Sequence, residues 1–290
     1  MHVDDLKIVV SCPIKNDNEY LIEFVEHYLN LGFNAIYLYD NNDDDSIIPS
    51  EILASYINDG KVIIINYRKQ VFNDVWHRKD FFSSYDFDWV LFVDDDEFLE
   101  LKHQENIKTF LARFDENATK IAFNNLHYGD NDKLYYEDGN VQDRFPRPLS
   151  LNSGTKNYKF NCAVKSLLKK VEIQTIQTIN AHTLIDHLPY YNADNRIRNM
   201  RSFWRMDEAD VSYGTAYIKH YCTKSLEEFV KCKIKRAMSN NMAYNERFDI
   251  NSYYYMYNER TRKKDELYKL FREQYLSELS TFNVILSFLL

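Results

Sequence analysis

The chain has 290 residues, of which 45% are hydrophobic and 16% aromatic, so it holds enough apolar material for a large buried core. Its 36 lysine and arginine residues are outnumbered by 44 aspartate and glutamate residues, which gives a formal net charge of −8. Binding of nucleic acid generally needs a dominating basic surface, so this balance argues against a nucleic acid partner. An acidic protein can still bind an anion where a cation lies between the two.

The cysteines and the two ends of the chain bear on its compartment. Cys12, Cys162, Cys222 and Cys232 form no C-x-x-C pair, so we expect reduced thiols in a cytoplasmic protein. No signal peptide is visible at the charged N-terminus, and no segment reaches the ~20 apolar residues of a membrane span. The apolar C-terminal run "NVILSFLL" is either a packed terminal element or a segment that makes peripheral contact with a membrane surface.

Strands and helices are predicted to alternate along the first part of the chain. Short β-branched runs such as "KIVVSC" are typical of strands. In contrast, "EYLIEFVEHYLNLG" places apolar residues at helical spacing, with Asn18 before it as a cap and Gly32 at its end. The predicted order is strand 7–12, helix 19–32, strand 35–40, helix 49–57, strand 61–66, helix 75–85, strand 89–94, helix 105–114 and strand 120–125.

This alternation predicts an α/β fold with a mostly parallel sheet flanked by helices. Ligands of such sheets bind beyond the carboxyl ends of the strands. Asp40 follows the second predicted strand, and the acidic residues 94–97 follow the fourth. We therefore expect these two groups to converge on the edge of the sheet where function is found.

The second half of the chain is less regular up to residue 222. Strands are predicted at 161–168, 179–186 and 215–221, and the chain becomes helical from Ser225. Ser225 with Glu228 three residues later is a capping-box pattern. We expect a main domain over residues 1–224 and a helical extension, residues 225–290, packed on it.

The stretch "WVLFVDDDE" (89–97) joins an apolar strand to four consecutive carboxylates. Carboxylates this close stay ionised at pH 7 only when a cation, hydrogen bonds or solvent compensate them. Asp94 and Asp96 can point to the same side because they are two residues apart, whereas Asp95 points elsewhere. Oxygen ligands suit Mg²⁺ or Mn²⁺, which also bind substrate phosphates. The pattern indicates an Asp-x-Asp metal site, and the alternative is a solvated acidic turn.

The segment "DNNDDDSIIPSE" (40–51) places oxygen-bearing side chains at the ligand positions of a twelve-residue calcium loop. However, Asp45 stands where such a loop needs glycine, Pro49 interrupts the segment, and a strand rather than a helix precedes it. We favour a nucleoside-binding loop in which Asp40 accepts hydrogen bonds from a base or ribose.

Several motifs in register resemble one enzyme family. The opening "CPIKNDNEYLIEFVEHYLNLGFNAIYLYDNNDDDS" and the run "WVLFVDDDEF" resemble family 2-like glycosyltransferases of the GT-A fold, in a subgroup akin to family 92. The resemblance covers residues 7–235, and Asp95 departs from it because relatives usually carry an apolar or small residue there. Later landmarks follow in the same order, namely "RF" (144–145), "KS" (165–166), His182 and "HYCTKSLEEFVKCK" (220–233).

The resemblance implies an enzyme that moves a sugar, such as a hexose, from a nucleotide-diphosphate donor to a hydroxyl of a glycan or glycolipid acceptor. Such enzymes build surface polysaccharides and glycoconjugates. Asp94 and Asp96 would bind Mn²⁺ or Mg²⁺, which neutralises the departing diphosphate, and Glu97 would orient these ligands. The third protein ligand would be a histidine, either His220 or His182.

The resemblance also implies residues that bind the donor and one that takes the acceptor proton. An inverting transferase needs a general base, for which Asp186 is the candidate and Asp207 and Glu208 are competitors, whereas a retaining enzyme needs none. Arg78, Arg144 and Lys165 would pair with phosphate oxygens, and the alternative for each taken singly is a surface ion pair. The implied donor-binding residues are Pro13, Lys15, Asn16, Asp40, Asn41, Arg78, Asp95, Arg144 and Lys165.

Two other functions compete with a glycosyltransferase. A sugar nucleotidyltransferase has a similar sheet but cradles its triphosphate with a glycine-rich loop, and "CPIKNDNEY" contains no glycine. A non-catalytic calcium- or glycan-binding module would need no nucleotide pocket. The donor sugar, the acceptor, the linkage and the oligomeric state stay open.

Overall fold

The chain forms two compact units, Met1–Leu126 with Leu151–His220, and His127–Ser150 with Tyr221–Leu290. The last segment of the second unit begins at Tyr221, whereas the sequence places a domain boundary after residue 224. The segment His127–Ser150 also belongs to the second unit, together with the C-terminal helices. The computed structural model describes residues 3–16, 18–42, 48–70, 74–104, 106–149, 158–170, 178–179, 184–185, 190–198, 200–202, 204–239 and 254–289.

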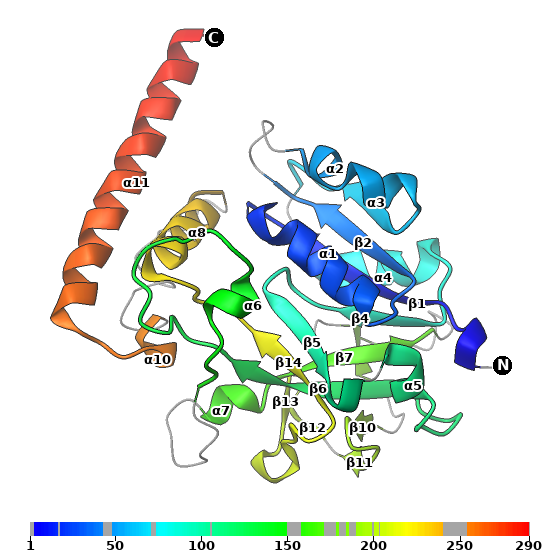
Figure 1. Ribbon diagram of the computed structural model, residues 1–290. Coiled ribbons are helices and arrows are strands. Elements are labelled where there is room, and N and C mark those ends of the chain that lie inside the picture. Colours follow the sequence, from blue (N-terminus) through cyan, green and yellow to red (C-terminus); the bar gives the residue numbers. More distant parts are fainter. Residues whose placement is uncertain are drawn as a thin grey trace. The chain divides into compact units, whose positions relative to one another are not determined.

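A mixed sheet of 10 strands is the framework of the first unit (Figure 1). Its order is β11-β10-β6-β7-β4-β1-β2-β3, and β14 pairs with both β5 and β6. Its strands are β1 (Ile8–Ile14), β2 (Ala35–Asp40), β3 (Val62–Asn66), β4 (Trp89–Phe92), β5 (Glu97–Leu101), β6 (Lys120–His127), β7 (Val164–Lys169), β10 (Tyr190–Asn192), β11 (Ile197–Arg198) and β14 (Ala216–His220). Two further pairs of short strands are β8 (Thr178–Ile179) with β9 (Leu184–Ile185) and β12 (Met200–Ser202) with β13 (Arg205–Met206).

Parallel pairing joins four successive strands of the large sheet. Strands β3, β2, β1 and β4 are joined by parallel pairs, and so are β6 and β10, whereas β7 runs antiparallel between β4 and β6. The predicted α/β class with a mostly parallel sheet flanked by helices is confirmed (Figure 1). The helices of this unit are α1 (Leu21–Asn30), α2 (Pro49–Ile52), α3 (Ala54–Asn58), α4 (Asp74–Ser84), α5 (Ile107–Leu111) and α7 (Tyr158–Asn161), with 3-10 turns at Val3–Asp5, Asn18–Tyr20, Lys102–Gln104 and Glu208–Asp210.

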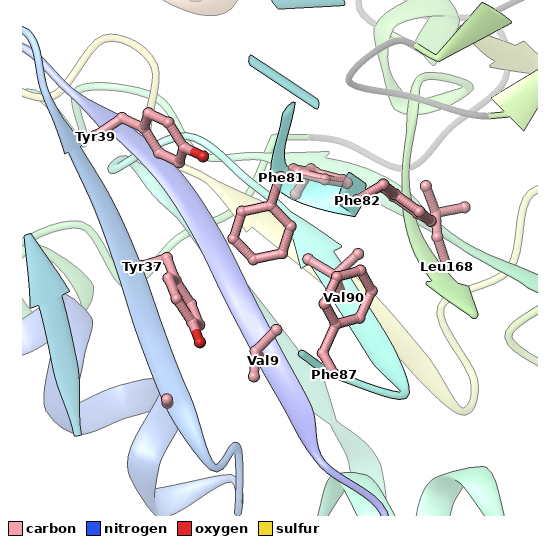
Figure 2. Packing of buried hydrophobic residues seen from close by; sticks show 10 residues of the cluster. Val9, Tyr37, Tyr39, Phe81, Phe82, Phe87, Val90 and Leu168 are labelled. Carbon is pink, nitrogen blue, oxygen red and sulfur yellow. The ribbon is translucent and has the colours of Figure 1, made fainter. Parts of the chain in front are cut away.

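Aromatic side chains fill the layer between α4 and the sheet (Figure 2). Tyr37 and Tyr39 are two residues apart on β2, so both point to this face, and Phe81 of α4 meets Tyr37 edge-on with ring centroids 5.0 Å apart. This packing holds β1, β2 and β4 side by side, which fixes the strand ends where the polar residues emerge. The cluster consists of Val9, Ala35, Tyr37, Tyr39, Phe81, Phe82, Phe87, Val90, Phe92 and Leu168.

Strand β5 was missed by the sequence analysis, because its residues "EFLEL" are few and begin inside the acidic run. It pairs antiparallel with β14, and the register places Glu97 opposite His220. Helix α1 fastens its start, since the Tyr28 hydroxyl donates to the Glu97 carbonyl oxygen (2.9 Å) and accepts from the Leu99 amide (3.3 Å). Phe98, which lies between these two backbone contacts, packs against Phe24 with ring centroids 6.0 Å apart.

Helices dominate the second unit. The predicted capping box is confirmed, because the Ser225 amide donates to Glu228 Oε2 (3.1 Å) and the Glu228 amide donates to Ser225 Oγ (3.3 Å). None of the helices in the described part of the chain combines the length and apolar character needed to cross a bilayer. The helices are α6 (Val141–Arg144), α8 (Leu226–Ser239), α10 (Tyr255–Tyr257) and α11 (Arg262–Leu289), and their core contains Leu226, Phe229, Val230, Tyr254 and Phe271.

The structure divides two of the predicted elements. The single strand expected at 179–186 is wrong, since Thr178–Ile179 and Leu184–Ile185 pair antiparallel with each other. The helix expected at 49–57 is divided at Leu53, which lies outside helical geometry with φ −105° and ψ 18°. Neither difference moves a strand that supports the acidic residues.

We predict that Tyr28→Phe destabilises the first unit by about 1–3 kcal/mol, because it leaves a buried carbonyl and a buried amide of β5 without their partner. The free energy of unfolding in urea measures this loss. Tyr56→Phe is the matched control, since its hydroxyl bonds Glu26 at an exposed position. Equal stabilities of the two variants would show that Tyr28 does not fasten β5.

Candidate functional site

A buried lysine lies between two of the four consecutive carboxylates. Lys165 Nζ is 2.8 Å from Asp94 Oδ2 and 2.9 Å from Glu97 Oε2. The Lys165 and Glu97 side chains are only 2% and 1% exposed, whereas that of Asp94 is 49% exposed. The amide of Asp94 also donates to Glu97 Oε2 (3.0 Å), so the turn after β4 folds back on its own glutamate.

The strand pattern explains why these residues meet. Leu91 of β4 is paired with Leu167 of the antiparallel β7, so Lys165 lies level with the chain where it leaves β4. Glu97 begins β5 directly opposite His220, the last residue of β14. Side chains directly opposite in an antiparallel pair lie on one face and approach closely. The carboxyl end of β4 is therefore surrounded by groups from β5, β7 and β14.

His220 faces two of the carboxylates. Its Nε2 is 3.5 Å from Asp96 Oδ1 and its Nδ1 is 3.6 Å from Glu97 Oε1, and the exposed fractions of His220 and Asp96 are 17% and 18%. Asn125 of β6 adds its Nδ2 at 3.4 Å from His220 Nδ1. Asp96 and His220 thus form a partly exposed pair beside the buried ion pair of Lys165 and Glu97.

The pKa values of Asp94 and Glu97 are shifted in opposite directions. Partial desolvation opposes ionisation of the half-exposed Asp94, but the Lys165 ammonium, helped by Arg78 and His220, outweighs it and holds the pKa of Asp94 well below its usual range. Burial raises the pKa of Glu97, and the charges of Asp94 and Asp96 add to this rise against the opposing effect of Lys165. Burial lowers the pKa of Lys165, but the two carboxylates outweigh it and raise that pKa. Asp94 and Lys165 are therefore charged at neutral pH.

Two of the predicted donor-binding residues, Arg78 and Asp95, are buried. The Arg78 side chain is buried, and its guanidinium carbon lies 4.5 Å from the centroid of the Phe92 ring. Asp95 is also buried, with 6% of its surface exposed, so it points inward as expected of the residue between Asp94 and Asp96. The sequence left open a phosphate contact or a surface ion pair for Arg78, and the structure places its charge close enough to lower the pKa of Asp94.

A second polar group lies at the ends of β1, β2 and β3, on the same edge of the sheet. Asp40 Oδ2 accepts from Arg68 Nε (2.8 Å), and Asp40 Oδ1 accepts from the amide (3.1 Å) and Nδ2 (2.7 Å) of Asn42. Asn42 Oδ1 in turn accepts from the Asn16 amide (2.6 Å) and from Asn18 Nδ2 (3.0 Å). Both oxygens of Asp40 thus hold neighbouring residues in place.

The neighbouring asparagine ties the same three strand ends together. Asn41 Nδ2 donates to the carbonyl oxygens of Tyr67 (2.7 Å) and Gln70 (3.1 Å), and Asn41 Oδ1 accepts from Lys15 Nζ (3.2 Å). Pro13 lies on β1 beside Tyr39. The structure therefore brings together the predicted residues Pro13, Lys15, Asn16, Asp40 and Asn41.

The remaining predicted site residues are Arg144, His182 and Asp186. Arg144 belongs to the second unit, where Nη1 and Nη2 donate to the two carboxylate oxygens of Glu228 (3.1 and 2.6 Å). This bidentate pair ties α6 to the start of α8. His182 and Asp186 lie outside the described residues. The residues 43–47 of the alternative calcium loop also lie outside them.

The side chains at the carboxyl end of β4 show whether the implied Mg²⁺ or Mn²⁺ ion could be coordinated there. Among the described residues, no group of three His, Cys, Asp or Glu side chains could hold one ion. Mg²⁺ and Mn²⁺ are commonly held by one or two protein ligands with phosphates and waters in the other positions. The pair of Asp96 Oδ1 and His220 Nε2, 3.5 Å apart, fits such an ion. An ion bound there would take its remaining ligands from substrate phosphates and waters.

Sequence reasoning missed Arg68, Asn42 and Asn125. Arg68 follows β3 at the same edge where Asp40 follows β2, so the rule for strand ends, applied to the third strand, would have found it. Asn125 lies on β6 and reaches His220 only because β14 folds back beside that strand. The contact between Asn125 and His220 joins residues 95 positions apart, so no local sequence pattern predicts it.

We predict that Lys165→Met lowers the free energy of unfolding by about 3 kcal/mol, because it leaves Glu97 buried without its ion-pair partner. The double variant Lys165→Met/Glu97→Gln recovers much of this loss. Lys219→Met is the control, since its pair with Glu100 (2.6 Å) is partly exposed and contributes at most about 1 kcal/mol. Urea unfolding measures all three, and equal losses for Lys165→Met and Lys219→Met would contradict the assignment.

Solved structures similar to this chain are distant. TarS 1–349 of S. aureus is 13% identical with a TM-score of 0.38, and the match covers 94% of this chain and 72% of that chain. The longer TarS chain is 14% identical with the same TM-score of 0.38, over 80% of this chain and 40% of that chain. A mannosyltransferase from Pyrobaculum calidifontis, solved with GDP-Man and Mn²⁺, is 11% identical with a TM-score of 0.34, over 41% of this chain and 35% of that chain.

A comparison with curated proteins gave no match. The comparison with protein families is decisive, because one family model matches residues 8–262, which is most of the chain and includes both polar groups at the edge of the sheet. The resemblance seen in the sequence motifs is thereby confirmed. The chain belongs to glycosyltransferase family 92.

Proposed function

We propose that this protein transfers a sugar from a nucleotide-diphosphate sugar to a hydroxyl group of a glycan or glycolipid acceptor, with the help of Mn²⁺ or Mg²⁺. One observation carries the proposal: Asp96 and His220 present partly exposed ligand atoms, with the half-exposed carboxylate of Asp94 nearby, at the carboxyl end of β4, where ligands of α/β sheets bind. Membership in family 92 supports the reaction class.

The chemistry proposed is a substitution at the anomeric carbon of the donor. The acceptor oxygen forms a bond to this carbon while the bond to the diphosphate oxygen breaks, and the electron pair leaves with the nucleoside diphosphate. The acceptor proton passes to a base. The leaving group carries the developing negative charge, so groups that neutralise it accelerate the reaction.

The ion would be held by Asp96 and His220, with Asp94 beside them. When bound, a divalent cation supplies Lewis-acid stabilisation of the leaving diphosphate. The buried contacts behind these residues keep them oriented, because Glu97 lies opposite His220 and is itself held by Lys165. Orientation by such supporting contacts commonly changes metal affinity or activity by about 10- to 100-fold.

The nucleoside is proposed to lie at the second polar group. Asp40, with both oxygens engaged, would position Arg68 and Asn42 instead of meeting the ribose or base alone. Lys15, held at 3.2 Å by Asn41, is the cation of this group nearest the end of β1. The asparagine network would therefore set the shape of the nucleoside pocket.

The acceptor base is proposed to be Asp186, which carries over from the family resemblance. Arg144 is proposed to act on the second unit's own structure through Glu228. A cytoplasmic location and contact of the C-terminal segment with a membrane surface stay predictions.

We predict that Asp96→Asn and His220→Asn each reduce the metal-dependent release of nucleoside diphosphate by about 100-fold or more, because both remove a ligand of the ion that stabilises the leaving group. The assay incubates the protein with UDP- and GDP-linked sugars and Mn²⁺, and it measures the nucleoside diphosphate released. Asp94→Asn is expected to reduce release as well, through the same cluster.

Glu100→Gln is the matched control, since Glu100 lies on β5 but pairs with Lys219. It should retain near wild-type release. Unchanged release by Asp96→Asn would contradict the metal site, and absence of release with every donor would contradict the transferase.

A further inference from the structure

We propose that Asn125 is a positioning residue that determines which ring nitrogen of His220 carries its hydrogen, and thereby whether Nε2 can coordinate an ion. The coordination of an ion rests on the proposed function, whereas the position of the hydrogen is a property of the protein itself. An imidazole coordinates a metal through a nitrogen that carries no hydrogen, and the contact of its other nitrogen decides which one that is.

The backbone of Asn125 on β6 is fixed from two sides. Its amide donates to the Ala163 carbonyl oxygen (2.8 Å), and its carbonyl oxygen accepts from the Tyr213 hydroxyl (3.0 Å). The residue is only 3% exposed. The side chain is therefore held where its Nδ2 lies 3.4 Å from Nδ1 of His220.

In the absence of a cation, the contacts of His220 favour a hydrogen on Nε2. An amide nitrogen only donates, so Asn125 Nδ2 pairs best with an Nδ1 that accepts. The hydrogen on Nε2 then faces Asp96 Oδ1 at 3.5 Å. With the hydrogen on Nδ1 instead, two donors would meet at Asn125, and the lone pair of Nε2 would face the carboxylate of Asp96.

A cation shared by Asp96 and His220 reverses this preference, because it needs the lone pair of Nε2. The Nε2–H bond breaks and its proton passes to water, while Nδ1 takes a proton from water, so the net charge of the ring is unchanged. A buried acceptor already faces Nδ1, since Glu97 Oε1 lies 3.6 Å away. Among the described residues, no group donates a hydrogen bond to this oxygen.

The side chain of Asn125 can serve both positions of the hydrogen. Its Oδ1 is also buried and without a hydrogen-bond donor in the described part of the chain. Rotation of the amide by half a turn exchanges Nδ2 for Oδ1, so that the same residue accepts from Nδ1–H. Leucine has a similar shape but neither donates nor accepts. Asn125→Leu therefore removes the contact that favours Nε2–H and leaves Glu97 to attract the hydrogen to Nδ1.

The experiment measures the ¹⁵N chemical shifts of the histidine rings in protein without metal or nucleotide. These shifts distinguish a nitrogen with a hydrogen from one without. Spectra are recorded at about pH 8, where an imidazole is ordinarily neutral. The signals that disappear in His220→Asn identify His220. We expect wild-type protein to carry the hydrogen on Nε2, and this spectrum tests the inference without any variant that must fold.

The variant arm compares Asn125→Leu with Asn124→Leu. In Asn125→Leu, the ratio of the Nδ1–H form to the Nε2–H form should rise roughly fivefold, the change that one ordinary hydrogen bond produces. Asn124 is the matched control, because its side chain leaves β6 on the opposite face and bonds the Ser212 amide (3.1 Å) and the Asn161 carbonyl oxygen (3.4 Å). Urea unfolding should show a loss of stability in both variants, whereas only Asn125→Leu should change the ratio.

A further arm adds Zn²⁺, a diamagnetic ion that imidazole binds well. We expect the signals of wild-type His220 to move to the form with the hydrogen on Nδ1. An unchanged spectrum would overturn the link to metal binding and would also count against the metal site of the proposed function.

The remaining outcomes separate this inference from the transferase. In metal-free wild type, a hydrogen on Nδ1 or on both nitrogens overturns the role of Asn125, and so does an unchanged ratio in Asn125→Leu. These results leave the transferase standing. If His220 behaves as expected but no donor sugar is consumed, the role of Asn125 stands and the transferase fails.

Discussion

The arrangement of the site depends on one interaction, the ion pair of Lys165 with Asp94 and Glu97. Four carboxylates in a row repel one another, and the chain brings them together where β4 ends. A buried cation of the protein's own compensates two of them, at 2.8 and 2.9 Å. Because Glu97 is almost completely buried, the pair constrains the turn after β4 more strongly than an exposed salt bridge could.

Strand pairing and one hydrogen-bonded tyrosine in the first unit position the residues of this ion pair and of its surroundings. The antiparallel β7 delivers Lys165, the pairing of β5 with β14 delivers His220 opposite Glu97, and Tyr28 fastens the start of β5 to α1. Aromatic packing beneath the sheet aligns the strand ends. As a result, Asp96 and His220 are partly exposed, whereas Lys165 and Glu97, which support them, are buried.

The alternation of apolar strands and helices was sufficient to predict the parallel part of the sheet, because strands such as 35–40 and 89–94 are local patterns. The acidic residues at strand ends pointed to the functional edge for the same reason. The contacts that organise the site are non-local. The sequence suggested a phosphate contact or a surface ion pair for Lys165 without naming a partner, and its pairing with Asp94, 71 residues away, follows from the position of the antiparallel β7.

Two further differences have physical causes of the same kind. The sequence did not predict strand β5, because its first residue, Glu97, belongs to the acidic run and the strand therefore lacks an apolar start. For Arg144 the sequence left open a phosphate contact or an ion pair, and the structure shows its guanidinium fork on the carboxylate of Glu228, which the capping box at the start of α8 holds in place. Basic residues in a motif do not reveal by themselves whether their anion is a ligand or a neighbour.

The most direct measurement is the anomalous scattering of manganese from crystals grown with Mn²⁺ and UDP or GDP. The account predicts a manganese peak at about 2.1 Å from a carboxylate oxygen of Asp96, a typical distance for such oxygen ligands, with His220 also bound and the diphosphate completing the shell. Lys165 should remain paired with Glu97. A bound nucleotide with no manganese at the carboxyl end of β4 would contradict the account.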